Sequence, residues 1–459
     1  MAVLITFLSL VLIALAGDAL PCRFFPRRMY SLTEHAVLGL LLGSGFAAYV
    51  LFCSSLVAPR FGMAVTVIAV VAVSAVRVYQ LQAALRSDFK FVGFRRTLWL
   101  LLPFGLWLVI LAVVAFSTDL GFDGLVTWGL KAKSAFLYGG WDISYFTDPL
   151  RQVTHQDYPL LVPTLEAWAY TFLARVDEGA VKVIFIAYYA ALLAIFYHAL
   201  RREFSRLLCV IYTLLLALTP YLASMSAISG YADLPLMLFV FSAAVYFRKG
   251  LIENSPSTLG LGLILSALGV WVKREGMIFL VFNLGALAVY LLWMRRKALQ
   301  TTLIFAVPVV LVLAPWLGFL AFKQIPNSDF VAPSLQVFWQ NIDRLPIIAV
   351  SLFGQFIALG QWGLLWVLFF AISLARWRNL LAASNLYLWL GIVIPITAFS
   401  AAFVFSAWQP FTEHLELSMD RLVLQVTPLV WYFIALQLPE LDGWLHDAVE
   451  QVTAREVRN

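Results

Sequence analysis

The chain has 459 residues, of which 63% are hydrophobic and only 12% are charged, and its mean hydropathy is +0.90. A soluble domain carries about 25% charged residues, so a single soluble core could not enclose this much apolar surface. The formal net charge of +6 comes from short basic clusters beside apolar stretches, which is typical of the cytoplasmic edge of a membrane and not of a nucleic-acid-binding surface.

Apolar stretches of about 20 residues, the length that a transmembrane helix needs, recur along the chain. The first, 2–18, has no basic residue before it and several after it, so we expect a retained span with its N-terminus outside and not a cleaved signal peptide. The sequence predicts an all-α polytopic membrane protein with about thirteen transmembrane helices. These are expected near 2–18, 34–57, 62–79, 97–117, 180–200, 205–223, 232–248, 257–272, 276–294, 302–322, 360–376, 385–406 and 422–438, with an interfacial helix or the first part of a longer span at 346–359.

The orientation depends on the stretch 160–174. We interpret this stretch as an amphipathic helix on the outer surface, because it is short for a crossing and contains Glu166. All six basic clusters then fall on one side, which the positive-inside rule identifies as the cytoplasm, and residues 118–179 form a large external loop. The clusters are Arg23/Arg27/Arg28, Arg86/Lys90/Arg95/Arg96, Arg201/Arg202/Arg206, Arg248/Lys249, Arg295/Arg296/Lys297 and Arg376/Arg378.

Two acidic residues stand at the outer ends of predicted spans. Asp123 precedes an expected amphipathic helix in the loop, where partial desolvation can raise its basicity enough to take a proton from a hydroxyl group. Asp233 lies in the run Gly-Tyr-Ala-Asp-Leu-Pro at 230–235, at the outer mouth of another span. Both positions also suit a carboxylate that caps a helix N-terminus, so a structural role stays open for each.

Other candidates on the outer side are polar or basic. His155 and Tyr158, in the stretch Thr-His-Gln-Asp-Tyr-Pro, can hydrogen-bond a ligand or simply lie on the surface. Lys273 and Arg274 form a turn between two spans, against the positive-inside trend, and adjacent cations there suit a phosphate head group; a solvated turn is the alternative. Arg421 would enter the last span from outside, which requires an anionic partner.

Several familiar catalytic motifs are missing from the sequence. It has no P-loop, no G-x-S-x-G elbow, no dinucleotide fingerprint and no Cys/His metal set, and its three cysteines are far apart. An ATP-driven machine is therefore not expected, and the energy must come from an activated substrate or a gradient. No cofactor is predicted; two acids and a phosphate could hold a divalent metal, but nothing in the sequence requires one.

The motifs together resemble the GT-C glycosyltransferase superfamily, polytopic enzymes that use polyprenyl-phosphate-linked sugars and include lipid A aminoarabinose transferases and protein O-mannosyltransferases. The shared features are an acid in a large external loop, the His-x-x-Tyr-Pro stretch at 155–159, the run at 230–235 and a short basic turn at 273–276. Three predicted spans precede the one that leads into the loop, more than the relatives usually have, and the loop has a single acid unless Asp119 is the second.

The resemblance implies a multi-pass glycosyltransferase of the cell inner membrane, for hexosyl or pentosyl groups. It would transfer a sugar from a polyprenyl-phosphate donor to a lipid, glycan or protein acceptor on the periplasmic or extracytoplasmic face, without nucleic acid. By resemblance, the general base is Asp123, the acceptor or sugar pocket is lined by Trp128, His155, Tyr158 and Asp233, and the donor phosphate is held by Lys273, Arg274 and Arg421. The implied domains are N-terminal transmembrane helices (1–96), a GT-C-like catalytic domain (97–440) and a cytoplasmic tail (441–459).

A secondary transporter or flippase of a lipid-linked or anionic solute is the alternative, because intramembrane charges serve transport too. It predicts an inverted repeat and broken helices near the middle of the membrane. The sequence shows neither, and the charges gather at one face. A structural subunit of an envelope-assembly complex is a third hypothesis, which predicts no deep outer cavity lined by Asp123, Asp233 and Arg421.

Overall fold

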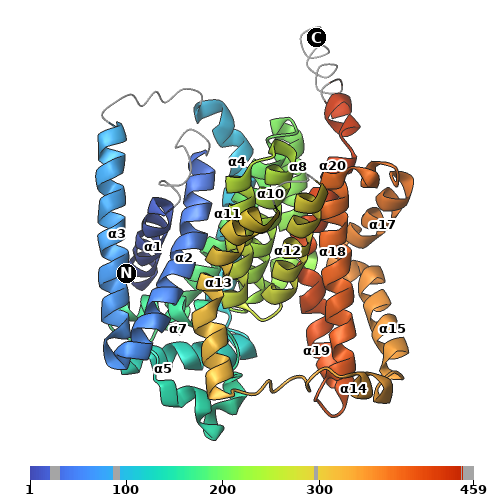
Figure 1. The fold of residues 1–459 in the computed structure, drawn as a ribbon. Helices are drawn as coiled ribbons and strands as arrows, with labels where there is room; N and C mark the ends of the chain where they lie inside the picture. The colour runs from blue at the N-terminus through green and yellow to red at the C-terminus, as the bar shows by residue number, and fades with distance from the viewer. Residues whose placement is uncertain (21–30, 86–93, 294–297, 446, 448–459) are drawn as a thin grey trace.

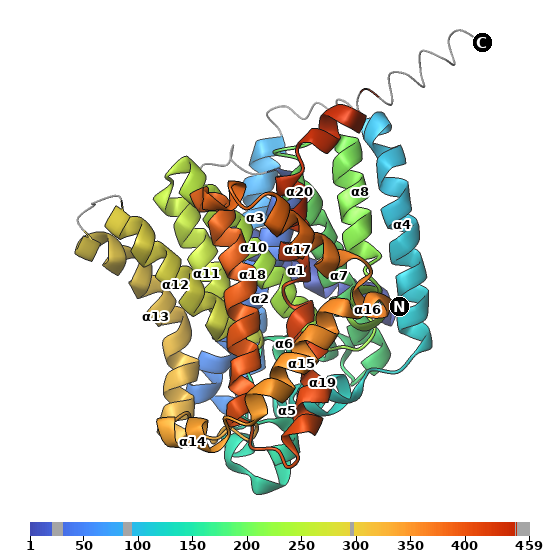
Figure 2. The ribbon, with the colours of Figure 1, turned by 90° about the vertical axis from the view of Figure 1, so that its right-hand side faces the viewer.

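The structure is a computed structural model that describes residues 1–20, 31–85, 94–293, 298–445 and 447, and these residues form an all-α protein (Figures 1 and 2). The first half begins with α1 (Ala2–Ala19), α2 (Leu32–Val57), η3 (Pro59–Phe61), α3 (Gly62–Leu85) and α4 (Phe94–Ser117). The loop that follows contains η4 (Gly124–Gly129), α5 (Leu130–Tyr138), η5 (Ile143–Thr147), η6 (Pro149–Thr154) and α6 (Leu161–Leu173). Next come α7 (Glu178–Leu200), α8 (Arg206–Ala217), α9 (Pro220–Met225) and α10 (Asp233–Glu253).

The second half continues the same pattern of long helices joined by short turns. It contains α11 (Pro256–Val272), α12 (Gly276–Trp293), α13 (Ala298–Lys323), α14 (Leu335–Gln340), α15 (Arg344–Ile357), α16 (Leu359–Trp362) and α17 (Leu365–Ala375). It ends with η7 (Asn379–Leu381), α18 (Ala383–Ala402), η8 (Phe403–Phe405), α19 (Phe411–Leu424) and α20 (Thr427–Gln437). The extended backbone in these residues makes one isolated bridge, between Phe330 and Ser406.

The predicted spans all coincide with helices, but the count of thirteen is not confirmed. Among the described residues, eight helices are long and apolar enough to cross a membrane, or up to nine if the bent pair α19–α20 counts as one span. Four further helices at predicted spans are shorter apolar segments, namely Leu102–Ser117 of α4, α8, α11 and α17. The stretch predicted at 346–359 is the short helix α15.

Three predicted basic clusters lie together at one end of the molecule, which is at the top of Figure 1 and is called the basic end. Arg248 pairs with Glu203 at 3.2 Å, which joins two of these segments directly. Residues 440–442 join a further pair, because the amide of Ser205 donates to Asp442 at 3.0 Å and Arg376 pairs with Glu440 at 2.7 Å. Arg202 forms an ion pair with Glu34 of α2. The loop that carries α5 lies at the opposite end, called the outer end. The clusters at 23–28, 86–90 and 295–297 and the side chains of Arg95 and Arg96 lie outside what the structure describes.

Helix α6 corresponds to the stretch 160–174. It has 13 residues, and it is not among the helices that qualify as spans, in agreement with the predicted topology. The prediction of a position on the outer surface was wrong, because the helix is enclosed by α1, α2, α5 and α7, and residues 161–170 are all buried. The indole of Trp168 donates to the carbonyl of Ser9 at 3.1 Å, and Glu166 is fully buried.

The corner between α2 and α3 holds part of the outer loop. The amide of Met63 donates to the carbonyl of Gly139 at 2.9 Å, and the amide of Trp141 donates to Ser55 Oγ at 2.9 Å. A cluster of aromatic rings adds to this contact, with Phe146 edge-on to Phe319 of α13 at 5.3 Å. The N-terminal helices therefore pack against the loop, and the predicted division at residue 96 stays a prediction.

The last apolar segment is broken between α19 and α20, which meet at an angle of 41°. Pro428 stands in the first turn of α20. Because proline has no amide hydrogen and its ring crowds the preceding turn, it accounts for a break at this position. The break leaves Arg421 and Gln425 in the last turn of α19 and just beyond it, facing the start of α10.

Candidate active site

Four predicted residues from distant parts of the chain meet at the outer ends of their helices. Asp123 directly precedes η4, Asp233 is the first residue of α10, and Lys273 lies in the turn between α11 and α12. The fourth, Arg421, comes from the last turn of α19. The chain of contacts between them is continuous, although Asp123 and Arg421 are 298 positions apart.

Arg421 is shared by the two acids. Its Nη1 donates to Asp123 Oδ2 at 2.7 Å, while Nε and Nη2 donate to Asp233 Oδ2 at 3.0 and 2.8 Å. The guanidinium also lies over the ring of Tyr231, with Cζ 4.4 Å from the ring centroid. A planar guanidinium with five donors can hold two carboxylates in this way, whereas an ammonium group cannot reproduce the geometry.

Asp233 is 2% exposed and has no direct opening to solvent. Its Oδ1 accepts from Lys273 Nζ at 2.9 Å and from Gln425 Nε2 at 3.0 Å, so both carboxylate oxygens are satisfied. A buried carboxylate is tolerated only when cations and donors pay its desolvation cost, which these partners do. The expected contact of Asp233 with sugar or acceptor is not what this geometry favours, since the carboxylate is enclosed by its own partners.

Neither acid caps the N-terminus of a helix, which was the structural role left open by the sequence. Neither Asp123 nor Asp233 makes a side-chain capping hydrogen bond at the helix that follows it. Asp123 Oδ1 accepts instead from Thr127 Oγ1 at 3.3 Å, and its Oδ2 faces Arg421. The side chain of Asp123 is 22% exposed, so it can still be reached from the outside.

A close approach of two loops places Asp123 beside the start of α10. The amide of Gly121 donates to the carbonyl of Ser229 at 2.9 Å. Gly230 has φ of +73°, in the left-handed region that favours glycine, and a Cβ there would meet Leu120 Cδ2 at 2.7 Å. A Cβ on Gly124 would lie 2.5 Å from the carbonyl oxygen of Ser229. Glycines at these positions let the two acids approach one arginine.

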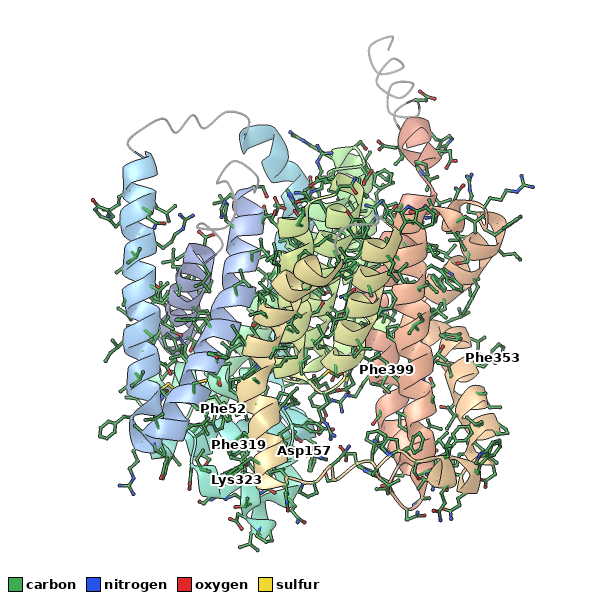
Figure 3. All side chains as sticks on the ribbon, in the orientation of Figure 1. Phe52, Asp157, Phe319, Lys323, Phe353 and Phe399 are labelled. Carbon is green, nitrogen blue, oxygen red and sulfur yellow. The ribbon has the colours of Figure 1, made fainter. Side chains whose placement is uncertain are left out.

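The turn at 273–276 connects this group to a second polar cluster. Lys273 also pairs with Glu275 at 2.8 Å, and the next residue, Arg274, forms an ion pair with Asp157. Burial lowers the pKa of Lys273, but Asp233 and Glu275 raise it above its usual value, so its ammonium stays charged. Burial raises the pKa of Asp157, and Arg274 opposes that effect. Figure 3 places Asp157 at the level of Phe319 and Lys323, near the outer end of α13.

The second cluster contains His155 and Tyr158. The hydroxyl of Tyr158 donates to Asp329 Oδ2 at 2.8 Å, and His155 Nδ1 lies 3.4 Å from the same oxygen. The two rings are stacked, with centroids 4.7 Å apart. Lys131, fully buried, donates to the carbonyls of His155 at 2.5 Å and Tyr158 at 3.3 Å, and burial lowers its pKa to about 7.

Trp128 belongs to this cluster as a packing residue. It is fully buried, and its ring lies against Tyr158 with centroids 5.6 Å apart and below Lys131 Nζ at 5.5 Å. The ring of Trp128 has no exposed face on which a sugar could stack in the way that the sequence predicted.

Several residues of the site were missed by sequence reasoning. Asp157 lay inside a stretch that was singled out, Glu275 lay inside the basic turn, and Gln425 follows Arg421 by one helical turn, so their spacing could have indicated them. Asp329 lies in the external piece 323–345 with no motif around it, and only its contacts with His155 and Tyr158 reveal it.

A comparison with known families adds an independent observation. The model of the family described as dolichyl-phosphate-mannose-protein mannosyltransferase matches residues 157–320, about a third of the chain. The matched segment contains Tyr158, Asp233, Lys273 and Arg274 and leaves Asp123 and Arg421 outside it. No curated protein and no solved structure matches the chain. With apolar helices suited to crossing a membrane several times and this family pattern at its centre, the chain is a multi-pass membrane protein whose resemblance to the GT-C glycosyltransferases is confirmed.

Proposed function

We propose that the protein transfers a sugar from a polyprenyl-phosphate donor to a hydroxyl group of an acceptor on the non-cytoplasmic face of the membrane. The observation that carries the proposal is the arginine bridge: Arg421 holds both Asp123 and Asp233, and Lys273 completes the group at the start of α10, the helix whose other end carries Arg248 and Lys249. The family match supports a lipid-linked sugar as the donor.

The reaction is a displacement at the anomeric carbon. The acceptor oxygen attacks that carbon, its bond to the donor phosphate oxygen breaks, and the configuration inverts. Asp123 accepts the proton of the acceptor hydroxyl as the attack proceeds. The polyprenyl phosphate leaves as a monoester with one more negative charge than the diester had. The sum of charges in the site is unchanged, because Asp123 loses the charge that the phosphate gains.

The position of Arg421 fits this movement of charge. Its Nη1 is paired with Asp123, and its other nitrogens are anchored to Asp233. A donor phosphate close to Nη1 and to Lys273 would compete with Asp123 for the same cation. As Asp123 becomes neutral, the arginine is released to stabilise the leaving phosphate, which is electrostatic stabilisation by a preorganised cation.

The remaining residues have supporting roles in the proposal. Arg274, whose side chain is 34% exposed, is the cation of the turn that a ligand reaches most easily. Asp233 positions Arg421 and Lys273 and does not touch the substrate. His155 and Tyr158 line the region next to the basic turn, where the sugar or the acceptor would lie.

The test is a transfer assay with purified protein, a panel of undecaprenyl-phosphate hexoses and a mixture of candidate acceptors. Asp123→Asn should reduce kcat by about 10²–10⁴-fold, the usual contribution of a general base. Asp119→Asn is the matched control, since Asp119 is an exposed acid of the same loop, and it should keep full activity. Full activity of Asp123→Asn would show that the assigned base is wrong, and loss of activity in Asp119→Asn alone would transfer the role to Asp119.

The break between α19 and α20 is the one observation that favours the transporter alternative, because broken helices beside charged residues occur in transporters. Pro428 gives the break a local cause, and the family match favours transfer. Proteoliposomes separate the two functions: the transferase should form glycosylated acceptor without moving a fluorescent undecaprenyl-phosphate analogue across the bilayer.

A further inference from the structure

The backbone of His155 has a conformation that few non-glycine residues adopt. Its φ is +48° and its ψ is +74°, in the left-handed region. Three hydrogen bonds hold it there: its amide donates to the carbonyl of Gln152 at 2.9 Å, and its carbonyl accepts from the amide of Tyr158 at 2.8 Å and from Lys131 Nζ at 2.5 Å. Strained backbone that the surroundings fix in this way is concentrated at functional sites.

The side chain of His155 is fixed as firmly as its backbone. One face of the ring stacks on Tyr158, and Nδ1 lies 3.2 Å from Ser328 Oγ and 3.4 Å from Asp329 Oδ2. The imidazole therefore has one orientation, set by a carboxylate that is 174 positions away in the chain. The side chain of His155 is 23% exposed, so a ligand can reach its remaining edge.

Asp329 is built to remain an anion. It is 3% exposed, and its carboxylate accepts from Tyr158 at 2.8 Å and from the indole of Trp408 at 3.2 Å. Its amide donates to Asn327 Oδ1 at 3.0 Å, and its carbonyl accepts from the amide of Ala407 at 2.9 Å. Burial alone would raise the pKa of Asp329, but His155 and the two donors lower it below its usual value.

The carboxylate of Asp329 favours one tautomer of the His155 ring. The Asp329 carboxylate, 3.4 Å from Nδ1, favours the neutral tautomer that carries its proton on Nδ1, and Ser328 Oγ at 3.2 Å can accept from the same nitrogen. In that tautomer Nε2 has a free electron pair. Within the described residues no hydrogen-bond partner faces Nε2. The exposed edge of His155 is therefore a hydrogen-bond acceptor that requires a donor from a ligand.

The position of Nε2 relative to the basic turn indicates which part of a ligand would donate this hydrogen bond. Tyr158, on which His155 stacks, also lies 5.9 Å from the guanidinium of Arg274, and Arg274 is adjacent in the chain to Lys273. A sugar attached to a phosphate at Lys273 and Arg421 would extend toward this pair of rings. Asp329 itself is enclosed, so it can act on a ligand only through His155.

We propose that Asp329 is a positioning residue that orients His155 so that Nε2 accepts a hydrogen bond from a hydroxyl or amino group of the sugar on the lipid-linked donor. The inference rests on the proposed function and names the substrate class of that site: neutral or amino sugars are accepted. A sugar that presents a carboxylate to Nε2 is rejected, because it meets an electron pair and a nearby anion with no proton between them.

Binding measurements test the inference separately from transfer. The probes are undecaprenyl phosphate, undecaprenyl-phosphate mannose and undecaprenyl-phosphate glucuronate, each titrated into detergent-purified protein with intrinsic tryptophan fluorescence as the signal. The wild type should bind the mannose lipid about tenfold more tightly than the sugar-free lipid, which is the contribution of one good hydrogen bond. It should bind the glucuronate lipid no more tightly than the sugar-free lipid. His155→Ala and Asp329→Asn should lose this gain and keep the wild-type Kd for undecaprenyl phosphate.

The sugar-free lipid is the control for folding, because its binding depends on Lys273 and Arg421. Ser328→Ala is the matched variant, since it removes the other group near Nδ1 and should keep the gain for mannose. Equal binding of all three lipids by the wild type, or an undiminished mannose gain in Asp329→Asn, would overturn the inference while leaving the proposed function in place. If the wild type binds none of the lipids, the proposed function itself is wrong, and this inference is wrong with it.

Discussion

Arg421 joins the two acids of the site, and its value lies in the shape of the guanidinium as much as in the charge. One edge is bound to Asp233 by two hydrogen bonds, which leaves Nη1 directed at Asp123. A lysine at this position would keep the charge but could not face both carboxylates in the same way.

We therefore expect Arg421→Lys to fold and to lose about 10²-fold in kcat, because one preorganised donor to the developing charge is missing. Arg421→Gln should also lower the free energy of unfolding by about 3 kcal/mol, since a buried anion loses a partner. Transfer assays and thermal unfolding in detergent measure the two effects. Arg378→Gln, at the exposed basic end, should change neither, and an active Arg421→Lys would contradict the argument.

Glu166 gives a pH-dependent prediction. It is fully buried, both of its carboxyl oxygens lack a hydrogen-bond partner, and burial raises its pKa well above 4.5. The folded protein therefore binds a proton that the unfolded chain releases above pH 4.5, so this residue reduces stability progressively as the pH rises toward the folded pKa. Glu166→Gln removes the titration and keeps the shape.

The variant should accordingly be more stable than the wild type at pH 7.5, and its advantage should shrink by up to about 1.4 kcal/mol for each pH unit toward pH 5. Thermal unfolding at several pH values checks this expectation. A stability difference that is the same at pH 5.5 and 7.5 would mean that Glu166 has a charged partner when folded.

At the scale of elements, the approach of the loop at 120–124 to the loop at 229–231 brings Asp123 and Asp233 together. Gly230→Ala adds a Cβ where φ is +73° and Leu120 is 2.7 Å away, so we expect a loss of about 1–2 kcal/mol in stability and a larger loss of transfer activity. Gly285→Ala in α12 is the control, because a Cβ there meets no atom within 4 Å, and alanine favours the helix. If both variants behave alike, the loop contact does not position the acids.

The helices themselves could be predicted, because apolar stretches of sufficient length have few other stable structures in a membrane. Their lengths were predicted less well: α8 (Arg206–Ala217) ends before Pro220 and is shorter than the stretch predicted at 205–223, whereas α11 (Pro256–Val272) matches the stretch predicted at 257–272. The position predicted for α6 was wrong because a short stretch that contains the acidic Glu166 was placed on the outer surface. Its burial depends on α1 and α2, which local sequence does not reveal.

One part of the candidate site could be predicted, namely the charged residues that the predicted topology places on one side of the membrane. Counting spans predicted Asp123, Asp233, Lys273 and Arg421 on one side of the membrane, and their contacts show that they lie together. The side of the membrane on which they lie stays a prediction. Asp329 could not be predicted, since His155 and Tyr158, the site residues that it contacts, are more than 170 positions away and the sequence around it carries no pattern. Trp128 is covered by Lys131, one helical turn away, and by Tyr158 from a later part of the loop, and the contact with Tyr158 is the one that local sequence does not reveal.

For the whole molecule, the two ends should lie on opposite sides of the membrane. In a cysteine-free background, Leu150→Cys, which is 90% exposed at the outer end, should react with a membrane-impermeant maleimide added to spheroplasts. Arg378→Cys at the basic end should react only after the membrane is permeabilised. The reverse pattern would invert the topology and move the proposed reaction to the cytoplasm.

The corner between α2 and α3, which binds the backbone of Gly139 and Trp141, has a consequence for engineering. The helices α1, α2 and α3 pack directly against the loop, so they are part of its support and not a separate membrane anchor. A hybrid that receives the loop from another enzyme would need the matching corner at Ser55 and Met63 as well. Transplanted alone, the loop would lose the attachment that keeps it close to the acid-bearing turns, and the hybrid would be inactive even with every charged residue in place.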